Sequence, residues 1–219
     1  MSYKEIPEIK VILLGETGVG KTSIIKRYYE DEFDSNVLTS FGCSYVDKDV
    51  EVDRKTYKLI IWDTIGQELY RSLSKSFVND AKIVILVYAI DNEKSFEDLD
   101  FWYKLYTEVL GTDVIMGVAG NKSDLFLQQV VPFEKGKKYA EEKGGIFSEI
   151  SAKENKESIN LFVMDLVKAY IHKGKKDLNE RKNRIKLDSD LIKKIIKQDA
   201  AFLKKLKIMI MYKNNYIYH

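Results

Sequence analysis

Hydrophobic residues along the first 170 or so positions fall into short runs that alternate between strand-like and helix-like spacing. Runs such as Ile83–Ala89 are β-branched and almost entirely apolar, which is typical of strands buried on both faces. The segments predicted as strands are Ile9–Leu14, Ser44–Val52, Tyr57–Trp62, Ile83–Ala89, Val114–Gly120 and Gly145–Ile150. The segments predicted as helices are Lys21–Glu32, Asn92–Leu110, Pro132–Lys143 and Asn155–Lys173.

This alternation predicts an α/β domain with a mostly parallel six-stranded sheet in three layers, covered by helices on both sides. Asp53-Arg54 suits a hairpin turn between two antiparallel strands, and Pro132 suits the first turn of a helix. In such folds ligands bind at the carboxyl ends of the strands. The candidate chemistry should therefore be sought just after each predicted strand.

Composition narrows the class of protein. Hydrophobic residues make up 45% of the 219 residues, enough for a packed core, and the apolar runs are shorter than a membrane-spanning helix needs. The first residues lack a signal-peptide core, and Ser2 stands where myristoylation would need glycine. The single cysteine, Cys43, excludes an internal disulfide and a cysteine-based zinc cage, so we expect a cytoplasmic protein.

Residues 15–22, GETGVGKT, follow a predicted strand and precede a predicted helix, and they match the phosphate-binding pattern GxxxxGK[ST]. Glycines allow successive backbone N–H groups to point at phosphate oxygens, and the helix N-terminus adds its dipole. Lys21 can span the β and γ phosphates, and the Thr22 hydroxyl can ligate Mg²⁺. The loop predicts a bound nucleotide but does not choose the base, because ATPases use the same loop.

Residues 121–124, NKSD, follow the buried strand Val114–Gly120. A carboxylate there can accept two charge-assisted hydrogen bonds from N1–H and the exocyclic amine of guanine. Adenine would leave that charge unpaired, which gives discrimination of about 10⁴ or better. Ser151-Ala152-Lys153 ends the last predicted strand, where its N–H groups could contact the guanine carbonyl or simply fill a loop. These segments together favour guanine.

Residues 62–68, WDTIGQE, end the third predicted strand and supply groups suited to Mg²⁺, the γ-phosphate and the attacking water. With GETGVGKT, NKSD and ISAK in the same order and spacing, the chain resembles the Ras superfamily of small GTPases over about residues 8–173. The Rab branch is the most similar, because KLIIWDT, LYRSL and LVYAI resemble its strands and second switch. The resemblance implies a three-layer P-loop GTPase domain that binds GTP or GDP with Mg²⁺ and acts in vesicle traffic.

The motifs and the resemblance together assign each site residue. The predicted nucleotide contacts are Gly15, Thr17, Gly18, Val19, Gly20, Lys21, Thr22, Ser23, Phe33, Ser40, Gly66, Asn121, Lys122, Asp124, Ser151, Ala152 and Lys153. The predicted Mg²⁺ ligands are Thr22, Ser40 and Asp63, and Gln67 is the predicted catalytic residue. Phe33 falls where the family places a ring over the guanine edge, although packing at a helix end explains it equally well.

Three positions depart from the family's pattern. Ser40 replaces the threonine of the first switch and keeps its hydroxyl, and Thr39 could substitute for it after a one-residue shift. Ile65 replaces an alanine before the catalytic glutamine, and Thr17 places bulk near the γ-phosphate. Both side chains should slow hydrolysis without preventing binding. We therefore predict a GTPase that is slow without an activating partner, with a GTP-binding scaffold as the alternative.

The C-terminal segment differs in charge from the rest of the chain. Residues 174–219 carry 13 Lys and Arg against 5 Asp and Glu, a net charge of +8, while residues 1–173 have a net charge of −6. An acidic body argues against nucleic-acid binding. Residues 189–210 show apolar residues at helical spacing with lysines between them, which predicts a basic amphipathic helix. We divide the chain into a GTPase domain, 1–173, and a linker with an amphipathic tail, 174–219.

Several roles remain open for this tail: contact with a membrane surface, a helix folded back on the domain, or none. A peripheral docking module in which nucleotide is only structural is a third reading of the whole chain. Rab proteins end in prenylated cysteines, whereas this sequence ends Tyr216-Ile217-Tyr218-His219, so we expect no anchor of that kind. We expect a monomer whose switch regions bind effectors, an exchange factor and a GTPase-activating protein, in the cytoplasm or peripheral on endomembranes.

Overall fold

The computed structural model describes residues 6–30, 44–63, 78–154 and 156–177. The chain divides into two compact units, Met1–Tyr170 and Ile171–His219, and most described residues belong to the first. The predicted division at residue 173 and the amphipathic tail stay predictions, and the tail lies outside the described residues. No helix within the described ranges is both long and apolar enough to cross a membrane.

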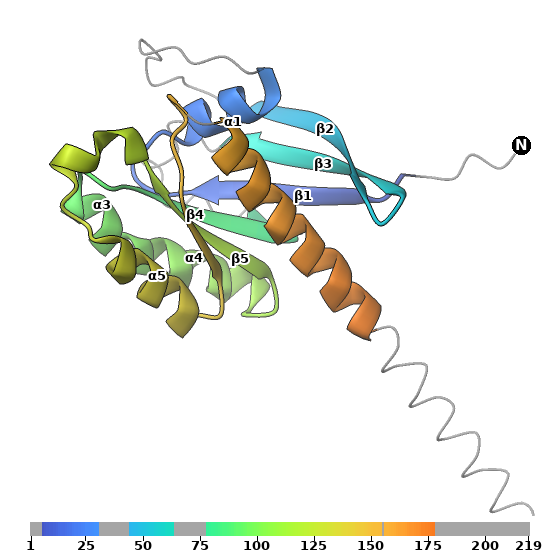
Figure 1. Cartoon of the computed structure of the whole chain (residues 1–219). Helices are drawn as coiled ribbons and strands as arrows, with labels where there is room; N and C mark the ends of the chain where they lie inside the picture. Colours follow the sequence, from blue (N-terminus) through green and yellow to red (C-terminus); the bar gives the residue numbers. More distant parts are fainter. Residues whose placement is uncertain (1–5, 31–43, 64–77, 155, 178–219) are drawn as a thin grey trace, which may run out of the picture. The chain divides into compact units, whose positions relative to one another are not determined.

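The first unit is built on a six-stranded sheet with the order β2-β3-β1-β4-β5-β6 (Figure 1). Only β2 runs antiparallel to its neighbour, so the prediction of a mostly parallel sheet is confirmed. The strands are β1 (Glu8–Leu14), β2 (Ser44–Val52), β3 (Lys55–Asp63), β4 (Ile83–Ala89), β5 (Ile115–Asn121) and β6 (Ile146–Glu149). The helices are α1 (Lys21–Glu30), α3 (Glu93–Glu97), α4 (Leu99–Leu110), the 3-10 helix η2 (Ser123–Gln128), α5 (Phe133–Glu142) and a helix over 156–177.

Two helical layers enclose the sheet because successive strand residues point to opposite faces. On one face Ile12 and Leu14 of β1 join a core with Phe96, Trp102 and Ala140 from α3, α4 and α5. On the other face α1 packs on β2 and β3. The helix over 156–177 lies so close to β5 on that side that a Cβ at Gly117 would come within 2.8 Å of Phe162 and Leu166. Every residue of β4 is buried, as its continuous apolar run predicts.

The hairpin between β2 and β3 confirms the turn predicted at Asp53-Arg54. Both residues have positive φ, 52° and 59°, which matches the twist of a two-residue hairpin loop. Trp62 near the end of β3 pairs with Ile12 of β1 and with Tyr45 of β2. The carboxyl end of β3 therefore reaches the same edge of the sheet as the loop that follows β1.

Two of the predicted helices differ from the structure. The segment Asn92–Leu110 forms two helices that break at Asp98, whose N–H still reaches the Lys94 carbonyl at 3.0 Å. Phe96 and Leu99, three positions apart, both enter the core on this face of the sheet, as they would in one continuous helix. Pro132 precedes α5 in an extended conformation, φ −61° and ψ 145°, so it is the N-cap rather than a first-turn residue.

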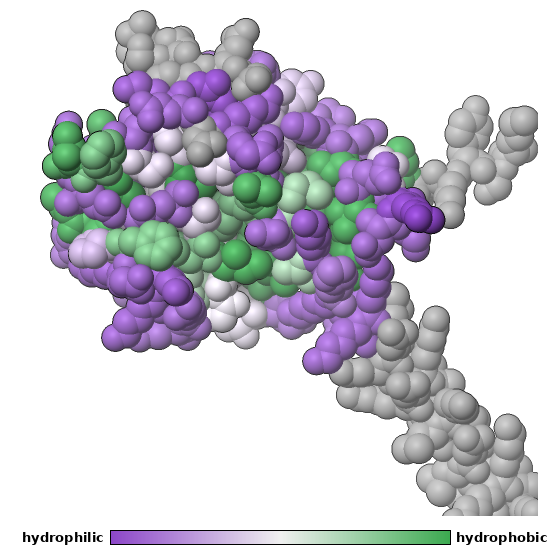
Figure 2. Space-filling model, in the orientation of Figure 1, coloured by the Kyte–Doolittle hydropathy of each residue, from purple (hydrophilic) through white to green (hydrophobic). Residues whose placement is uncertain are grey.

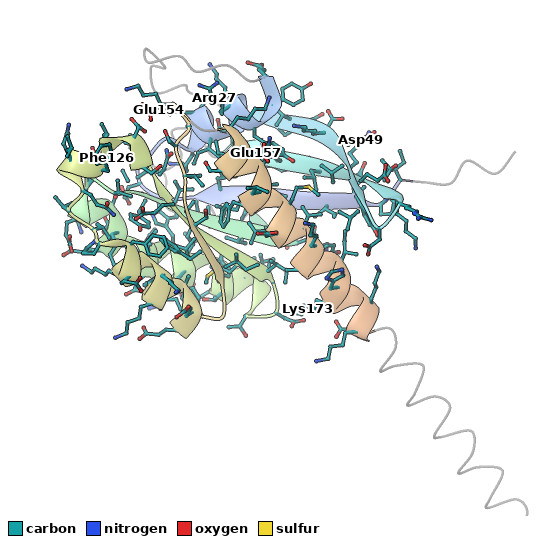
Figure 3. The ribbon with its side chains drawn as sticks, viewed as in Figure 1. Arg27, Asp49, Phe126, Glu154, Glu157 and Lys173 are labelled. Atoms are coloured by element: carbon teal, nitrogen blue, oxygen red, sulfur yellow. The ribbon has the colours of Figure 1, made fainter. Side chains whose placement is uncertain are left out.

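The surface is mostly hydrophilic in the view of Figure 2, with apolar side chains gathered around η2. The exposed hydrophobic residues of this region are Phe126, Leu127, Val130 and Phe133, and Figure 3 labels Phe126 among them. Sequence positions 125–133 carry no charged residue. Backbone hydrogen bonds from Val130 and Val131 to the Ile90 carbonyl, at 2.9 and 3.1 Å, fix this segment against the end of β4.

Candidate nucleotide-binding site

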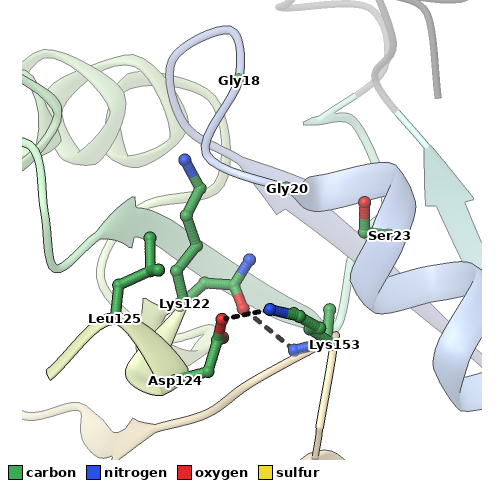
Figure 4. A pocket seen from close by; sticks show the side chains of 9 residues that line it. Gly18, Gly20, Ser23, Lys122, Asp124, Leu125 and Lys153 are labelled. Carbon is green, nitrogen blue, oxygen red and sulfur yellow. Dashed lines mark hydrogen bonds and ion pairs between the residues drawn. The ribbon is translucent and has the colours of Figure 1, made fainter. Parts of the chain in front are cut away.

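A cavity of about 330 Å³ opens at the carboxyl ends of β1 and β5, where α/β sheets bind ligands. Its lining comes from three separate segments of the chain: Gly18, Gly20, Ser23, Asn121, Lys122, Asp124, Leu125, Ala152 and Lys153. Figure 4 shows the loop with Gly18 and Gly20 facing Lys122 and Asp124 across this space. The volume falls within the range of small-molecule pockets.

The loop between β1 and α1 has the backbone that the phosphate-binding pattern requires. Gly15, Gly18 and Gly20 have φ values of 154°, 79° and 94°, which L-residues rarely adopt. A Cβ at Gly15 would lie 2.2 Å from the Val87 carbonyl oxygen, so the loop also approaches β4 too closely for any side chain. The turn is therefore open on the side that would receive phosphate.

Lys21 lies at the start of α1 with its side chain only 5% exposed. Its ammonium donates hydrogen bonds to the carbonyls of Gly15 and Glu16 at 2.8 and 2.9 Å. A buried lysine charge is costly unless it is paired with acceptors, so this cation is suited to receive an anion in the loop. The adjacent Thr22 is half-buried in the first turn of the same helix.

Asn121 joins the phosphate loop to the segment after β6. Its amide nitrogen donates to the Val19 carbonyl at 2.7 Å, and its amide oxygen accepts from the N–H of Ala152 at 3.3 Å. Asn121 is buried, and Gly20 approaches it so closely that a Cβ there would lie 2.3 Å from the amide nitrogen. These contacts explain why asparagine, whose side-chain amide both donates and accepts, stands at the end of β5.

Asp124 is oriented by two neighbours from the segment after β6. Its Oδ1 accepts a hydrogen bond from the Ser151 hydroxyl at 2.6 Å, and its Oδ2 lies 3.8 Å from the Lys153 ammonium. The Asp124 side chain is 6% exposed, so it is both held and shielded. A shielded, oriented carboxylate is what recognition of the guanine N1–H and amine requires.

Lys122 and Leu125 complete the cavity on either side of Asp124. Lys122 adopts a left-handed backbone, φ 67°, and its ammonium lies 3.7 Å from Asp91. In Figure 4 its side chain extends toward the turn at Gly18. The NKSD pattern did not indicate Leu125 or Asp91. The apolar residue directly after the motif could have been predicted to line the pocket of a flat base.

Asp63 is the last residue of β3 and is 3% exposed. Its strand ends at the same edge of the sheet as the phosphate loop, so the fold supports its predicted place near Mg²⁺. Ser40, Thr39 and Phe33, and likewise Gly66, Gln67 and Ile65, lie outside the described residues. No group of three or more His, Cys, Asp or Glu side chains converges within the described ranges.

Arg27 is a further residue of the site that sequence reasoning missed. Its guanidinium donates from Nε to the Ala152 carbonyl at 2.7 Å and from Nη2 to the Lys153 carbonyl at 2.6 Å. Figure 3 shows this side chain beside the chain around Glu154. The contact joins residues 125 and 126 positions apart, and no local pattern signals it.

A glycine-rich loop between a strand and a helix, next to a carboxylate-bearing base pocket, defines a P-loop protein of the guanine-nucleotide class. Comparison with known proteins agrees: the Ras family model matches residues 10–172. The chain therefore belongs to the Ras family, as a Rab-like small GTPase of intracellular vesicle traffic. Members of this family bind GTP and GDP with Mg²⁺ and hydrolyse GTP.

Individual relatives cover most of the described domain. Ras-related protein Rab-31 of Mus musculus is 41% identical over 148 residues, which cover 68% of this chain and 76% of the relative. Ras-related protein Rab-22A of Homo sapiens is 40% identical over 146 residues, covering 67% and 75%. Ras-related protein Rab-21 of Homo sapiens is 37% identical over 174 residues, covering 80% and 77%.

Proposed function

We propose that this small GTPase binds guanine nucleotide in the cavity between residues 15–23, 121–125 and 151–153, and hydrolyses GTP slowly without an activating partner. The observation that carries the proposal is the convergence of a buried Lys21, an oriented Asp124 and the bridging Asn121 around one space. Once GTP has left water, its phosphates need hydrogen-bond donors and its base needs an acceptor. Lys21 would supply the first and Asp124 the second.

The base and phosphate ends of the site have separate duties. Asp124 would accept hydrogen bonds from the guanine N1–H and amine, and the N–H of Lys153 would donate to the guanine carbonyl. Lys21 and the glycine amides would hold the β and γ phosphates. The donor set of Thr22, Ser40 and Asp63, all oxygen, fits Mg²⁺. Bound there, the ion would neutralise charge that develops on the phosphates.

Hydrolysis depends on positioning rather than on covalent chemistry by the protein. We propose that Gln67 orients the attacking water, with Gly66 contacting the γ-phosphate. The branched Ile65 beside them and Thr17 in the phosphate loop would restrict that geometry and slow the reaction. A trans-acting arginine is worth about 10³–10⁵ in rate. Arg54 lies in the β2–β3 hairpin, away from the cavity, and Arg71 lies outside the described residues, so neither is assigned that role.

Partner binding should centre on the two switch regions predicted around Ser40 and around Gln67, which adjoin β2 and β3 in the sequence. The ends of those strands carry an aromatic pair, Tyr45 and Trp62, whose ring centroids lie 5.3 Å apart. Tyr45 is 60% exposed, which suits contact with an effector, an exchange factor or an activating protein. We propose a monomeric switch, peripheral on endomembranes, whose C-terminal tail aids membrane contact.

The test is single-turnover hydrolysis of GTP preloaded on the purified protein, with Gln67→Leu measured alongside. We expect slow conversion to GDP that the substitution slows further by at least about 10-fold, since it removes the group that orients water. Retention of GTP for hours in both proteins would contradict autonomous hydrolysis. In that case the chain would be a GTP-binding scaffold unless an activating protein restored turnover.

A further inference from the structure

The segment 151–153 forms part of the cavity, and its peptide planes are held by neighbours on every side. The N–H of Ala152 donates to Asn121, and the N–H of Glu154 donates to the Ser151 hydroxyl at 3.0 Å. The carbonyls of Ala152 and Lys153 both accept from Arg27. The backbone of this segment is therefore held by Asn121 and Arg27 from elsewhere in the fold and by the hydroxyl of Ser151 within it.

Peptide geometry links the carbonyls that Arg27 holds to the donors that face the cavity. In a trans peptide the carbonyl oxygen and the next residue's N–H point in opposite directions within one plane. Arg27 binds the Ala152 carbonyl from the side of α1, so the N–H of Lys153 in the same plane is turned away from α1. Both Ala152 and Lys153 line the cavity, so this N–H is directed to the side that a base would occupy.

Arginine is suited to this role because its guanidinium is a rigid planar fork. Two N–H groups of Arg27, from Nε and Nη2, reach two successive carbonyls at 2.7 and 2.6 Å, and the planar guanidinium fixes the angle between these two donors. The side chain is half-buried, and Ala152 is 3% exposed. Charge-assisted hydrogen bonds in such surroundings are stronger than those between neutral groups.

The helix that carries Arg27 begins at the phosphate loop. Lys21 opens α1 and binds that loop, and Arg27 follows it by six positions in the same helix. Asn121 makes the second link, from Val19 to Ala152. The phosphate loop, α1 and the segment 151–153 are thus joined in a closed ring of contacts around the cavity.

We propose that Arg27 is a positioning residue for guanine: it holds the peptide plane that joins Ala152 and Lys153 so that the N–H of Lys153 meets the oxygen at C6 of the base. The inference rests on the proposed guanine site and deepens it. Arg27 does not touch the nucleotide; it acts through the backbone that does. Removing the fork should therefore weaken the contact to that oxygen and leave the contacts of Asp124 and Lys21 in place.

The experiment compares two nucleotides, both labelled on the ribose, in the presence of Mg²⁺. One is GDP, and the other is the 5′-diphosphate of 2-aminopurine riboside, which keeps the exocyclic amine and lacks both the oxygen at C6 and the hydrogen on N1. The N1–H is a proposed contact of Asp124 and its loss is the same in every variant, so the difference between variants reports on the oxygen. Dissociation rates are measured on the full chain and on Arg27→Gln and Arg27→Lys. Lys26→Gln is the control, because it removes the same charge from the adjacent position of the same helix.

We expect GDP to dissociate about 10-fold faster from Arg27→Gln and at an intermediate rate from Arg27→Lys. The analogue without the oxygen should dissociate at nearly the same rate from all three proteins, and Lys26→Gln should match the parent for both nucleotides. Equal acceleration for both nucleotides would overturn the inference, since it would show a general loss of the fold. Unchanged GDP dissociation in both Arg27 variants would also overturn it.

The parent protein separates this inference from the proposed function. If the parent protein retains neither GDP nor the analogue, the proposed guanine site itself is wrong. If it binds GDP and the analogue equally well, both the N1–H contact of Asp124 and the contact to the oxygen at C6 are refuted. If it retains GDP and the Arg27 variants release GDP at the parent's rate, the guanine site stands and the role of Arg27 alone is refuted. If Arg27→Gln does not fold, Arg27→Lys still decides the question, because it keeps the charge and the aliphatic stem.

Discussion

At the scale of single residues, the effect of a substitution depends on the atoms next to it, and the glycines of the phosphate loop show this most directly. Gly18 and Gly20 both adopt positive φ, so alanine at either position incurs a strain of about 1–2 kcal/mol. Their surroundings differ. A Cβ at Gly18 meets nothing within 4 Å, whereas a Cβ at Gly20 would lie 2.3 Å from the amide nitrogen of Asn121.

Gly20→Ala should therefore weaken GDP binding far more than Gly18→Ala. The added methyl group must displace the Asn121 amide from the Val19 carbonyl, which leaves a buried acceptor unpaired at a further cost of about 1–3 kcal/mol. The expected difference between the two variants is about 10- to 100-fold in the dissociation constant, measured by titration of nucleotide-stripped protein. Equal losses would show that backbone strain alone governs the loop.

At the scale of elements, α5 approaches the sheet through Gly136 on its buried face. A Cβ there would lie 2.3 Å from the hydroxyl of Tyr88 in β4 and 2.7 Å from Phe147 in β6. The Tyr88 hydroxyl is fully buried, with no hydrogen-bond partner in the part of the chain that the structure describes. Burial, and then the charge of Glu149, raise the pKa of Tyr88, so this hydroxyl stays protonated.

Gly136→Ala should destabilise the domain although alanine favours helices by about 1 kcal/mol. Overpacking against Tyr88 and Phe147 costs about 1–3 kcal/mol, so the free energy of unfolding should fall by about 1 kcal/mol. Tyr88→Phe removes the nearest atom, and the double variant should lose less than the two single changes together. Urea unfolding measures this, with Lys137→Ala on the exposed face of α5 as the control. Strict additivity would contradict the predicted contact.

Other elements show which local signals suffice. The Asp53-Arg54 hairpin, the strand β4 and the phosphate loop were predicted within a residue or two, because each has a periodicity or turn chemistry of its own. The break at Asp98 and the extended Pro132 were not. The apolar spacing signals neither of them, because Phe96 and Leu99 stand three positions apart and would share one face of a continuous helix as well.

At the scale of the whole molecule, charge is divided between an acidic body and a basic tail. The apolar and lysine positions of residues 189–210 predict a helix that binds anionic membrane surfaces. The full-length protein should co-sediment with vesicles containing phosphatidylserine, and a 1–173 truncation should not. Replacing Lys193, Lys194 and Lys197 with glutamine, or raising the salt concentration, should reduce the bound fraction, because the attraction is electrostatic in part. Equal pelleting of the full-length protein and the truncation would refute a membrane role for the tail.

By itself, the sequence determined the class of fold and the chemical identity of most site residues. The chemistry of the motifs GETGVGKT and NKSD can be inferred without a structure. Glycine permits the tight turn, and a carboxylate is suited to hydrogen bonds from guanine.

Only the tertiary structure decided how these segments support one another. Asn121 bridges 102 positions to Val19, and Arg27 reaches 125 positions to Ala152, distances over which no periodicity operates. The hydroxyl of Ser151 finds Asp124 because β5 and β6 lie side by side in the sheet. Such contacts depend on the strand order and on how far each side chain reaches once the sheet is packed, and neither is written in the local sequence.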